Sequence, residues 1–173
     1  MALVDAAGDG ITATVSLLLD GGADVEARTY DGDTALIKAA YYGHPATVSL
    51  LLDRGAKVEA KNIYGAAALI NAACNGHTAT VSLLLDRGAD VEAKTIYGDT
   101  ALTWAAGNGH TATMALLLAR CPEAAQVSGP RVFVLPSQPA ALADLQSAIR
   151  MNVPTFARRR RLLLMHMWRI AWL

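Results

Sequence analysis

The chain has little cysteine and proline for its 173 residues. Its two cysteines, Cys74 and Cys121, are too few for a disulfide framework or for a zinc site of their own. Six prolines and 14 glycines are too few for a collagen-like or disordered chain. These counts leave a globular protein of about one domain. Free cysteines are typical of a reducing compartment, so we expect the cytoplasm, with the nucleus as the alternative.

Long hydrophobic runs are also missing. No run of apolar residues reaches the roughly 18 that a membrane-spanning helix needs. The longest candidate, Leu162–Leu173, contains His166 and Arg169. The first residues lack a basic segment and carry Asp5 and Asp9, so we expect no signal peptide.

Net charge is absent from the whole chain but not from its parts. Fifteen Lys and Arg residues balance 15 Asp and Glu residues. Residues 1–121 hold 8 basic and 13 acidic residues, whereas residues 122–173 hold 7 and 2, so the two parts carry net charges of −5 and +5. This asymmetry predicts different partners for the two parts.

An internal repeat dominates the sequence. The triplet Leu-Leu-Leu begins at residues 17, 50, 83 and 116, and the pair Gly-His begins at 43, 76 and 109. Gly32, Gly65 and Gly98 keep the same step of 33 residues. Several residue types share one period in one register, so the chain is built from repeats.

One repeat, residues 32–61, predicts two short helices and an extended link. Thr34 can cap the first helix, and Gly43 can end it with a positive φ. Pro45 suits the first turn of the second helix, and Gly55 ends that helix. The link that follows, to Gly65, suits a hairpin-like finger. The apolar faces comprise Ala35, Leu36, Ala39 and Ala40, then Val48, Leu51 and Leu52.

These units resemble ankyrin repeats. The likeness lies in Gly-Asp-Thr-Ala-Leu-Ile-Lys-Ala-Ala-Tyr-Tyr-Gly-His at 32–44 and Val-Ser-Leu-Leu-Leu-Asp-Arg-Gly-Ala at 48–56, and again at 65–89 and 98–118. It covers about residues 1–120. The resemblance implies an all-α solenoid of stacked helix pairs with short β-hairpin-like fingers, to which a C-terminal helical tail is added.

The chain also departs from the family pattern. The family motif Thr-Pro-Leu-His lacks its Pro and His at 34–37, 67–70 and 100–103. Ala67 lacks a capping hydroxyl, which costs about 1 kcal/mol. Cys121 stands where the earlier repeats have Gly, and Pro122 follows, so we expect the repeats to end there. The expected organisation is a repeat domain over 1–121 (about 1–31, 32–64, 65–97 and 98–121), a linker over 122–138 and a helical tail over 139–173.

Catalytic and metal-binding signals are weak. His44, His77 and His110 recur at the repeat period, but the resemblance gives this residue a structural role, tying one loop to its neighbour. Metal ligation would need these residues at bonding distance from one ion, which stacked repeats do not allow. No nucleophile–base pair or phosphate loop is present. We expect no enzyme activity, no cofactor and no metal.

The positions that vary between repeats predict the binding surface. By the resemblance, partners bind at the finger tips and the exposed end of each first helix. Arg54 and Arg87 extend this row of residues. All five tyrosines fall on it, and Tyr, Trp and Arg are enriched in interface hot spots. An alternative is that Tyr64 and Tyr97 only pack between fingers. The predicted protein-binding residues are Tyr30, Asp31, Asp33, Lys38, Tyr41, Tyr42, Ile63, Tyr64, Asn71, Asn75, Ile96, Tyr97, Asp99, Trp104 and Asn108.

The tail has three interpretations. It can cap the last repeat, because solenoids need a capped end. Its basic run of Arg158, Arg159, Arg160 and Arg161, followed by apolar residues to Leu173, can instead lie on an anionic membrane surface or bind nucleic acid. The sequence as a whole predicts a monomeric, non-catalytic adaptor or scaffold that binds a protein partner and no small-molecule substrate. Membrane or nucleic-acid contact through 158–173 is the alternative.

Overall fold

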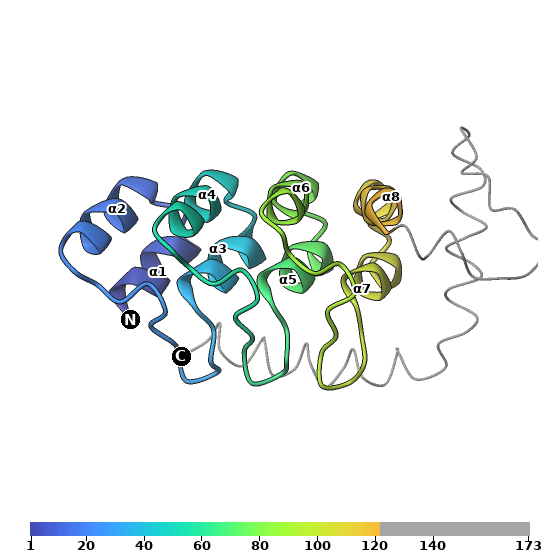
Figure 1. Ribbon diagram of the computed structural model, residues 1–173, viewed down its shortest axis with the longest axis horizontal. Coiled ribbons are helices and arrows are strands. Elements are labelled where there is room, and N and C mark those ends of the chain that lie inside the picture. The colour runs from blue at the N-terminus through green and yellow to red at the C-terminus, as the bar shows by residue number, and fades with distance from the viewer. Residues whose placement is uncertain (122–173) are drawn as a thin grey trace, which may run out of the picture. The chain divides into compact units, whose positions relative to one another are not determined.

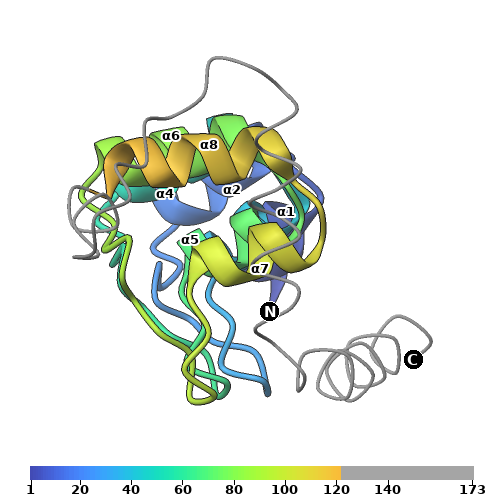
Figure 2. The same ribbon diagram turned by 90° about the vertical axis from the view of Figure 1, so that its right-hand side faces the viewer.

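The computed structural model describes residues 1–121, in which eight helices form four successive pairs (Figure 1). Seen along the array, one helix of each pair lies in an inner row and the other in an outer row (Figure 2). The inner helices are α1 (Ala2–Gly8), α3 (Ala35–Tyr42), α5 (Ala68–Cys74) and α7 (Ala101–Gly107). The outer helices are α2 (Thr12–Asp20), α4 (Pro45–Asp53), α6 (Thr78–Asp86) and α8 (Thr111–Arg120).

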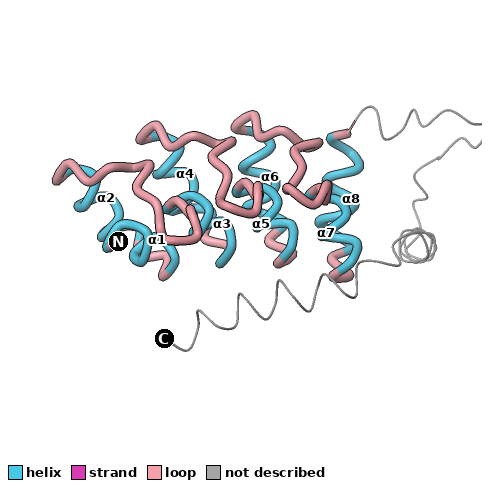
Figure 3. The backbone as a smooth tube through the Cα atoms, turned by 90° about the horizontal axis from the view of Figure 1, so that it is seen from below, coloured by secondary structure: helices cyan, strands magenta, loops and turns pink. Residues whose placement is uncertain are grey.

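Three finger loops recur along the array (Figure 3). They connect α2 to α3, α4 to α5 and α6 to α7. The only β pairing among residues 1–121 is an isolated antiparallel bridge between Arg28 and Thr34. The expected all-α solenoid is confirmed. The expected linker at 122–138, the helical tail at 139–173 and the basic residues 158–161 lie outside the described residues, and the domain boundaries stay predictions.

The helix ends follow the local sequence. The Thr34 hydroxyl accepts a hydrogen bond from the Ile37 amide at 3.3 Å and caps α3, whereas Ala67 leaves α5 without a side-chain cap, as expected. Gly43 ends α3 with a φ of +75°, a conformation in which glycine carries no Cβ penalty. Cys121 ends α8 in an extended conformation instead, because it replaces the glycine of the earlier repeats.

The core lies between the two rows of helices. Alanines of α3, α5 and α7 are fully buried, which lets neighbouring repeats approach closely, and Leu36 and Leu69 fill the space between them. On α4, Val48 and Leu51 are buried as predicted, while Leu52 is only half-buried. Thr47 is also fully buried, which the apolar pattern missed.

The recurring histidines join each repeat to the one before it. The Nε2–H of His44 donates to the Gly8 carbonyl at 2.9 Å, and His77 and His110 donate to the Tyr41 and Cys74 carbonyls at 3.0 Å each. A carbonyl can only accept, so each ring must carry its proton on Nε2. The structural role expected for these residues is confirmed.

Buried threonines make a second set of contacts between repeats, and one is interrupted. The hydroxyls of Thr12 and Thr47 lie 2.8 Å apart, as do those of Thr78 and Thr113. Pro45 occupies the position of Thr12 and Thr78 in the second repeat, so it has no hydroxyl to offer. The buried Thr80 hydroxyl therefore has no hydrogen-bond partner among the described residues.

Replacing Thr80 by valine should stabilise the protein. A buried hydroxyl without a partner keeps its full desolvation cost, so we expect Thr80→Val to raise the free energy of unfolding by about 1 kcal/mol. Urea unfolding measures this change. Thr113→Val is the matched control, since it removes a paired hydroxyl and should lower the free energy of unfolding by about 1 kcal/mol. Equal effects of the same sign at both positions would contradict the assignment.

Candidate protein-binding surface

Each finger is a tight turn closed by its own backbone. In the first, the Thr29 amide donates to the Asp33 carbonyl at 3.0 Å and the Gly32 amide donates to the Thr29 carbonyl at 2.9 Å. The same pair of bonds recurs at residues 62–66 and 95–99. Gly32 takes a φ of +76°, which few residues other than glycine adopt readily. The finger prediction is therefore correct, although the finger arms are not regular strands.

The finger tips are also bonded to one another. The Ile63 amide donates to the Asp31 carbonyl at 3.1 Å, and the Ile96 amide donates to the Tyr64 carbonyl at 3.0 Å. Both bonds span the same sequence separation, so the three fingers form one continuous surface.

The most exposed apolar side chains of the fingers share one repeat position. Tyr30 is 94% exposed, Ile63 54% and Ile96 65%. Tyr97, one residue further on, is exposed too, while Tyr64 is half-buried. We call Tyr30, Ile63 and Ile96 the finger row. Apolar side chains that remain in water at the same position of three fingers do not contribute to folding by burial.

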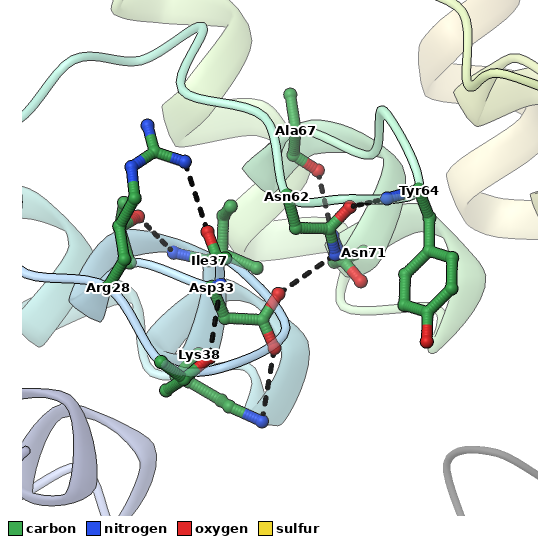
Figure 4. A network of polar contacts seen from close by, with 11 residues as sticks. Arg28, Asp33, Ile37, Lys38, Asn62, Tyr64, Ala67 and Asn71 are labelled. Atoms are coloured by element: carbon green, nitrogen blue, oxygen red, sulfur yellow. Dashed lines mark hydrogen bonds and ion pairs between the residues drawn. The ribbon is translucent and has the colours of Figure 1, made fainter.

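Asp33 is the centre of a polar network between the first two fingers (Figure 4). One carboxylate oxygen accepts from Asn62 Nδ2 at 2.8 Å, and the other pairs with Lys38 Nζ at 3.2 Å. The Asn62 side-chain oxygen in turn accepts from the amides of Tyr64 and Ala66 at 3.1 and 3.0 Å. With its side chain only 13% exposed, Asp33 holds fingers together. Sequence reasoning missed Asn62.

The residues predicted on the inner helices differ in their surroundings. The rings of Tyr41 and Tyr42 meet edge to face with centroids 4.9 Å apart, and only Tyr42 is exposed. The pKa of Tyr41 is raised above its usual 10.0, first by burial and then by the nearby Tyr42, Cys74 and Asp33. Trp104 is half-buried.

The predicted asparagines donate to backbone carbonyls. Asn71 Nδ2 bonds the Ala67 carbonyl and Asn75 Nδ2 bonds the Asn71 carbonyl, each at 3.0 Å. Asn108 Nδ2 bonds the Cys74 carbonyl at 2.8 Å and so crosses from one repeat to another. These amide groups help to hold the inner helices, and their half-exposed side chains still border the surface.

Comparison with known families decides what this architecture is. A family model described as ankyrin repeats in three copies matches residues 1–62 and 59–128, well over half of the chain. The chain belongs to the ankyrin-repeat family. No curated protein matches it. Ankyrin repeats generally mediate protein–protein interaction, and the family is typically non-catalytic.

In these ankyrin repeats, Arg54 and Arg87 lie outside the fingers and the inner helices that carry the predicted binding residues. Both follow the C-terminal ends of outer helices, where Arg54 pairs with Asp20 at 2.7 Å and Arg87 pairs with Asp53 at 2.8 Å. Arg120 repeats the contact with Asp86 at 2.8 Å. Each arginine therefore reaches back to the preceding repeat, and the expectation that Arg54 and Arg87 extend the binding row stays a prediction.

Two kinds of site are absent from residues 1–121. No group of three or more His, Cys, Asp or Glu side chains is placed to hold a metal ion there. No helix within that range is long and apolar enough to cross a membrane.

Removing the Asn62 side chain should loosen the first two fingers. Asn62→Ala deletes one donated and two accepted hydrogen bonds, so we expect the free energy of unfolding to fall by about 2 kcal/mol. Thr29→Ala, at the same position of the first finger, deletes one accepted bond and should lower it by about 1 kcal/mol. Chemical unfolding compares the two. A smaller loss for Asn62→Ala than for Thr29→Ala would argue against the network.

Tyr41 should make the protein sensitive to alkaline pH. The pKa of the Tyr41 phenol is higher in the folded chain than its unfolded value of 10.0, so protonated Tyr41 favours the folded state. This contribution to stability is intact below pH 10 and is lost as the pH rises through the folded pKa. In Tyr41→Phe the free energy of unfolding should therefore fall less steeply above pH 10 than in the wild type. Thermal unfolding at a series of pH values tests this, and identical slopes would contradict it.

Proposed function

We propose that the finger row, together with the adjacent Tyr97 and with Tyr42 at the C-terminal end of α3, binds a protein partner. The observation that supports this most strongly is the location of exposed apolar side chains. Among residues 1–121, eight large apolar side chains are exposed, and five of them are Tyr30, Tyr42, Ile63, Ile96 and Tyr97. Aromatic and aliphatic side chains held in solvent on one surface are typical anchors of an interface.

A preformed surface supports the same proposal. The hydrogen bonds between fingers and the Asp33–Asn62 contact fix the row before any partner arrives. Binding then requires little ordering of the backbone, so more of the contact energy remains as affinity. Polar groups at the rim, such as Lys38, Asn71 and Asn75, would fix the partner's orientation.

The cellular role that fits this surface is that of an adaptor or scaffold. We propose a monomeric chain without catalytic activity that holds a protein partner on its fingers and inner helices. Cys74 and Cys121 are not joined by a disulfide, which supports the cytoplasm or the nucleus as its location. The alternative contact with membranes or nucleic acid rests on residues 158–173, outside the described part of the chain.

Site-specific crosslinking tests the proposal. A photoreactive amino acid replaces Tyr30, Ile63 or Ile96 in the full chain, which is expressed in cells and irradiated. The matched control positions are Ala46 and Ala79, which are exposed near the starts of the outer helices α4 and α6. We expect one protein adduct shared by the three finger positions.

Two further results decide the outcome. The adduct should disappear when unlabelled wild-type chain competes, but should persist when the competitor carries Tyr30→Ser, Ile63→Ser and Ile96→Ser. An adduct that forms equally from Ala46 and Ala79, or that the triple variant displaces as well as the wild type, would contradict the proposal.

A further inference from the structure

The other three exposed large apolar side chains, Met1, Ile11 and Leu17, all belong to the first repeat. Leu17 is 72% exposed, whereas the residues at its position in later repeats, Leu50, Leu83 and Leu116, are half-buried. Ala2 is exposed, although Ala35, Ala68 and Ala101 at the same position are fully buried. Thr14 is exposed and Leu18 half-buried at positions that are buried in every later repeat. We call Ala2, Ile11, Thr14, Leu17 and Leu18 the first-repeat face.

The first repeat also lacks two of the side chains that tie a repeat to the one before it. Ile11 stands at the position of the histidines that donate to the preceding repeat. Gly21 stands at the position of Arg54, Arg87 and Arg120, which pair with the preceding repeat. Another repeat of the same kind could be joined through neither contact. The first-repeat face is therefore apolar but lacks the histidine and arginine contacts of such a junction.

The surroundings of this face are acidic. Residues 1–27 contain Asp5, Asp9, Asp20, Asp24 and Glu26 and no Lys or Arg. Arg54 pairs with Asp20, but Asp5, Asp9 and Asp24, all exposed, form no ion pair with any of residues 1–121. A partner therefore meets apolar side chains bordered by uncompensated negative charge. Two copies of this face would repel each other, which disfavours a second copy of the chain as the occupant.

We propose that the first-repeat face binds a basic amphipathic helix of a partner protein. Thr14 and Leu18 lie four residues apart on one side of α2, and Ile11 immediately precedes that helix. Such a ridge accepts the apolar side of another helix. In later repeats a helix pair covers the corresponding positions, so the face already has the shape of a helix-packing surface. Lysine or arginine on the flanks of the bound helix would compensate Asp5 and Asp9.

The test uses the full chain and a synthetic helical peptide with leucine along one side and lysine along the other. Its affinity is measured by isothermal titration calorimetry against the wild type, against Ile11→Ser with Leu17→Ser, and against Ile63→Ser with Ile96→Ser. The first double variant changes the first-repeat face, and the second is a matched change in the finger row. All four side chains are exposed, so both variants should fold like the wild type.

We expect the first-repeat variant to bind the peptide at least about tenfold more weakly and the finger-row variant to bind it like the wild type. Affinity for the wild type should fall as salt is added, and a peptide with glutamate in place of lysine should bind at least about tenfold more weakly. Equal binding by wild type and first-repeat variant, or equal binding of the two peptides, would overturn the proposal. So would a wild-type dimer in sedimentation that Ile11→Ser with Leu17→Ser abolishes, because the occupant would then be a second copy. None of these results depends on the finger row, so the proposed function can fail separately.

Discussion

The contact on which the array depends is the packing of a histidine ring against a glycine of the preceding repeat. Gly10 has a φ of +71°, and a Cβ added to it would lie 2.6 Å from Nδ1 of His44. The same ring donates from Nε2 to the Gly8 carbonyl. One histidine thus fixes both the distance between two neighbouring helix pairs and their alignment relative to each other. The arrangement recurs at His77 and at His110, so one geometry is repeated along the array.

Once that spacing is set, the other contacts between repeats recur with it. On the outer helices, arginines pair with aspartates of the preceding repeat, and in the fingers the Glu26 and Glu59 carboxylates accept from the amides of Lys57 and Asp90 at 2.8 and 2.9 Å. Most of these ion pairs are exposed and each contributes little to stability. Together, the contacts between repeats keep the fingers in one row. The side chains at the finger tips take no part in these contacts and are free to vary.

Much of the frame could be predicted from the sequence because it depends on local rules. The period, the helix pairs, the cap at Thr34 and the glycine at the end of α3 all follow from residues within one repeat. The contacts between repeats were harder to predict. Asn62 occupies the same position as Thr29 and Thr95, which also accept backbone hydrogen bonds, but only its longer amide reaches Asp33 in the preceding finger. The ion pair of Arg54 does not follow from its own repeat, because its partner is Asp20, one repeat away.

The degree of exposure was the least predictable property of the candidate surface. Tyr30 and Tyr64 were both expected at finger tips, yet they differ by one place in the repeat, and only Tyr30 stands fully in solvent. Likewise, Asp33 and Tyr41 were expected to be available for binding but are largely occupied by neighbouring groups. What the two proposed surfaces share is large apolar side chains that are exposed to solvent.

The three fingers form one preformed surface instead of three independent loops. Amide hydrogen exchange of the full chain tests it most directly at Ile63 and Ile96, whose amides donate to the preceding finger. A preformed surface predicts that both amides exchange much more slowly than an unfolded chain, with protection approaching that of the inner helices. Exchange of both amides at unfolded-chain rates would show that the fingers move independently and would contradict the account.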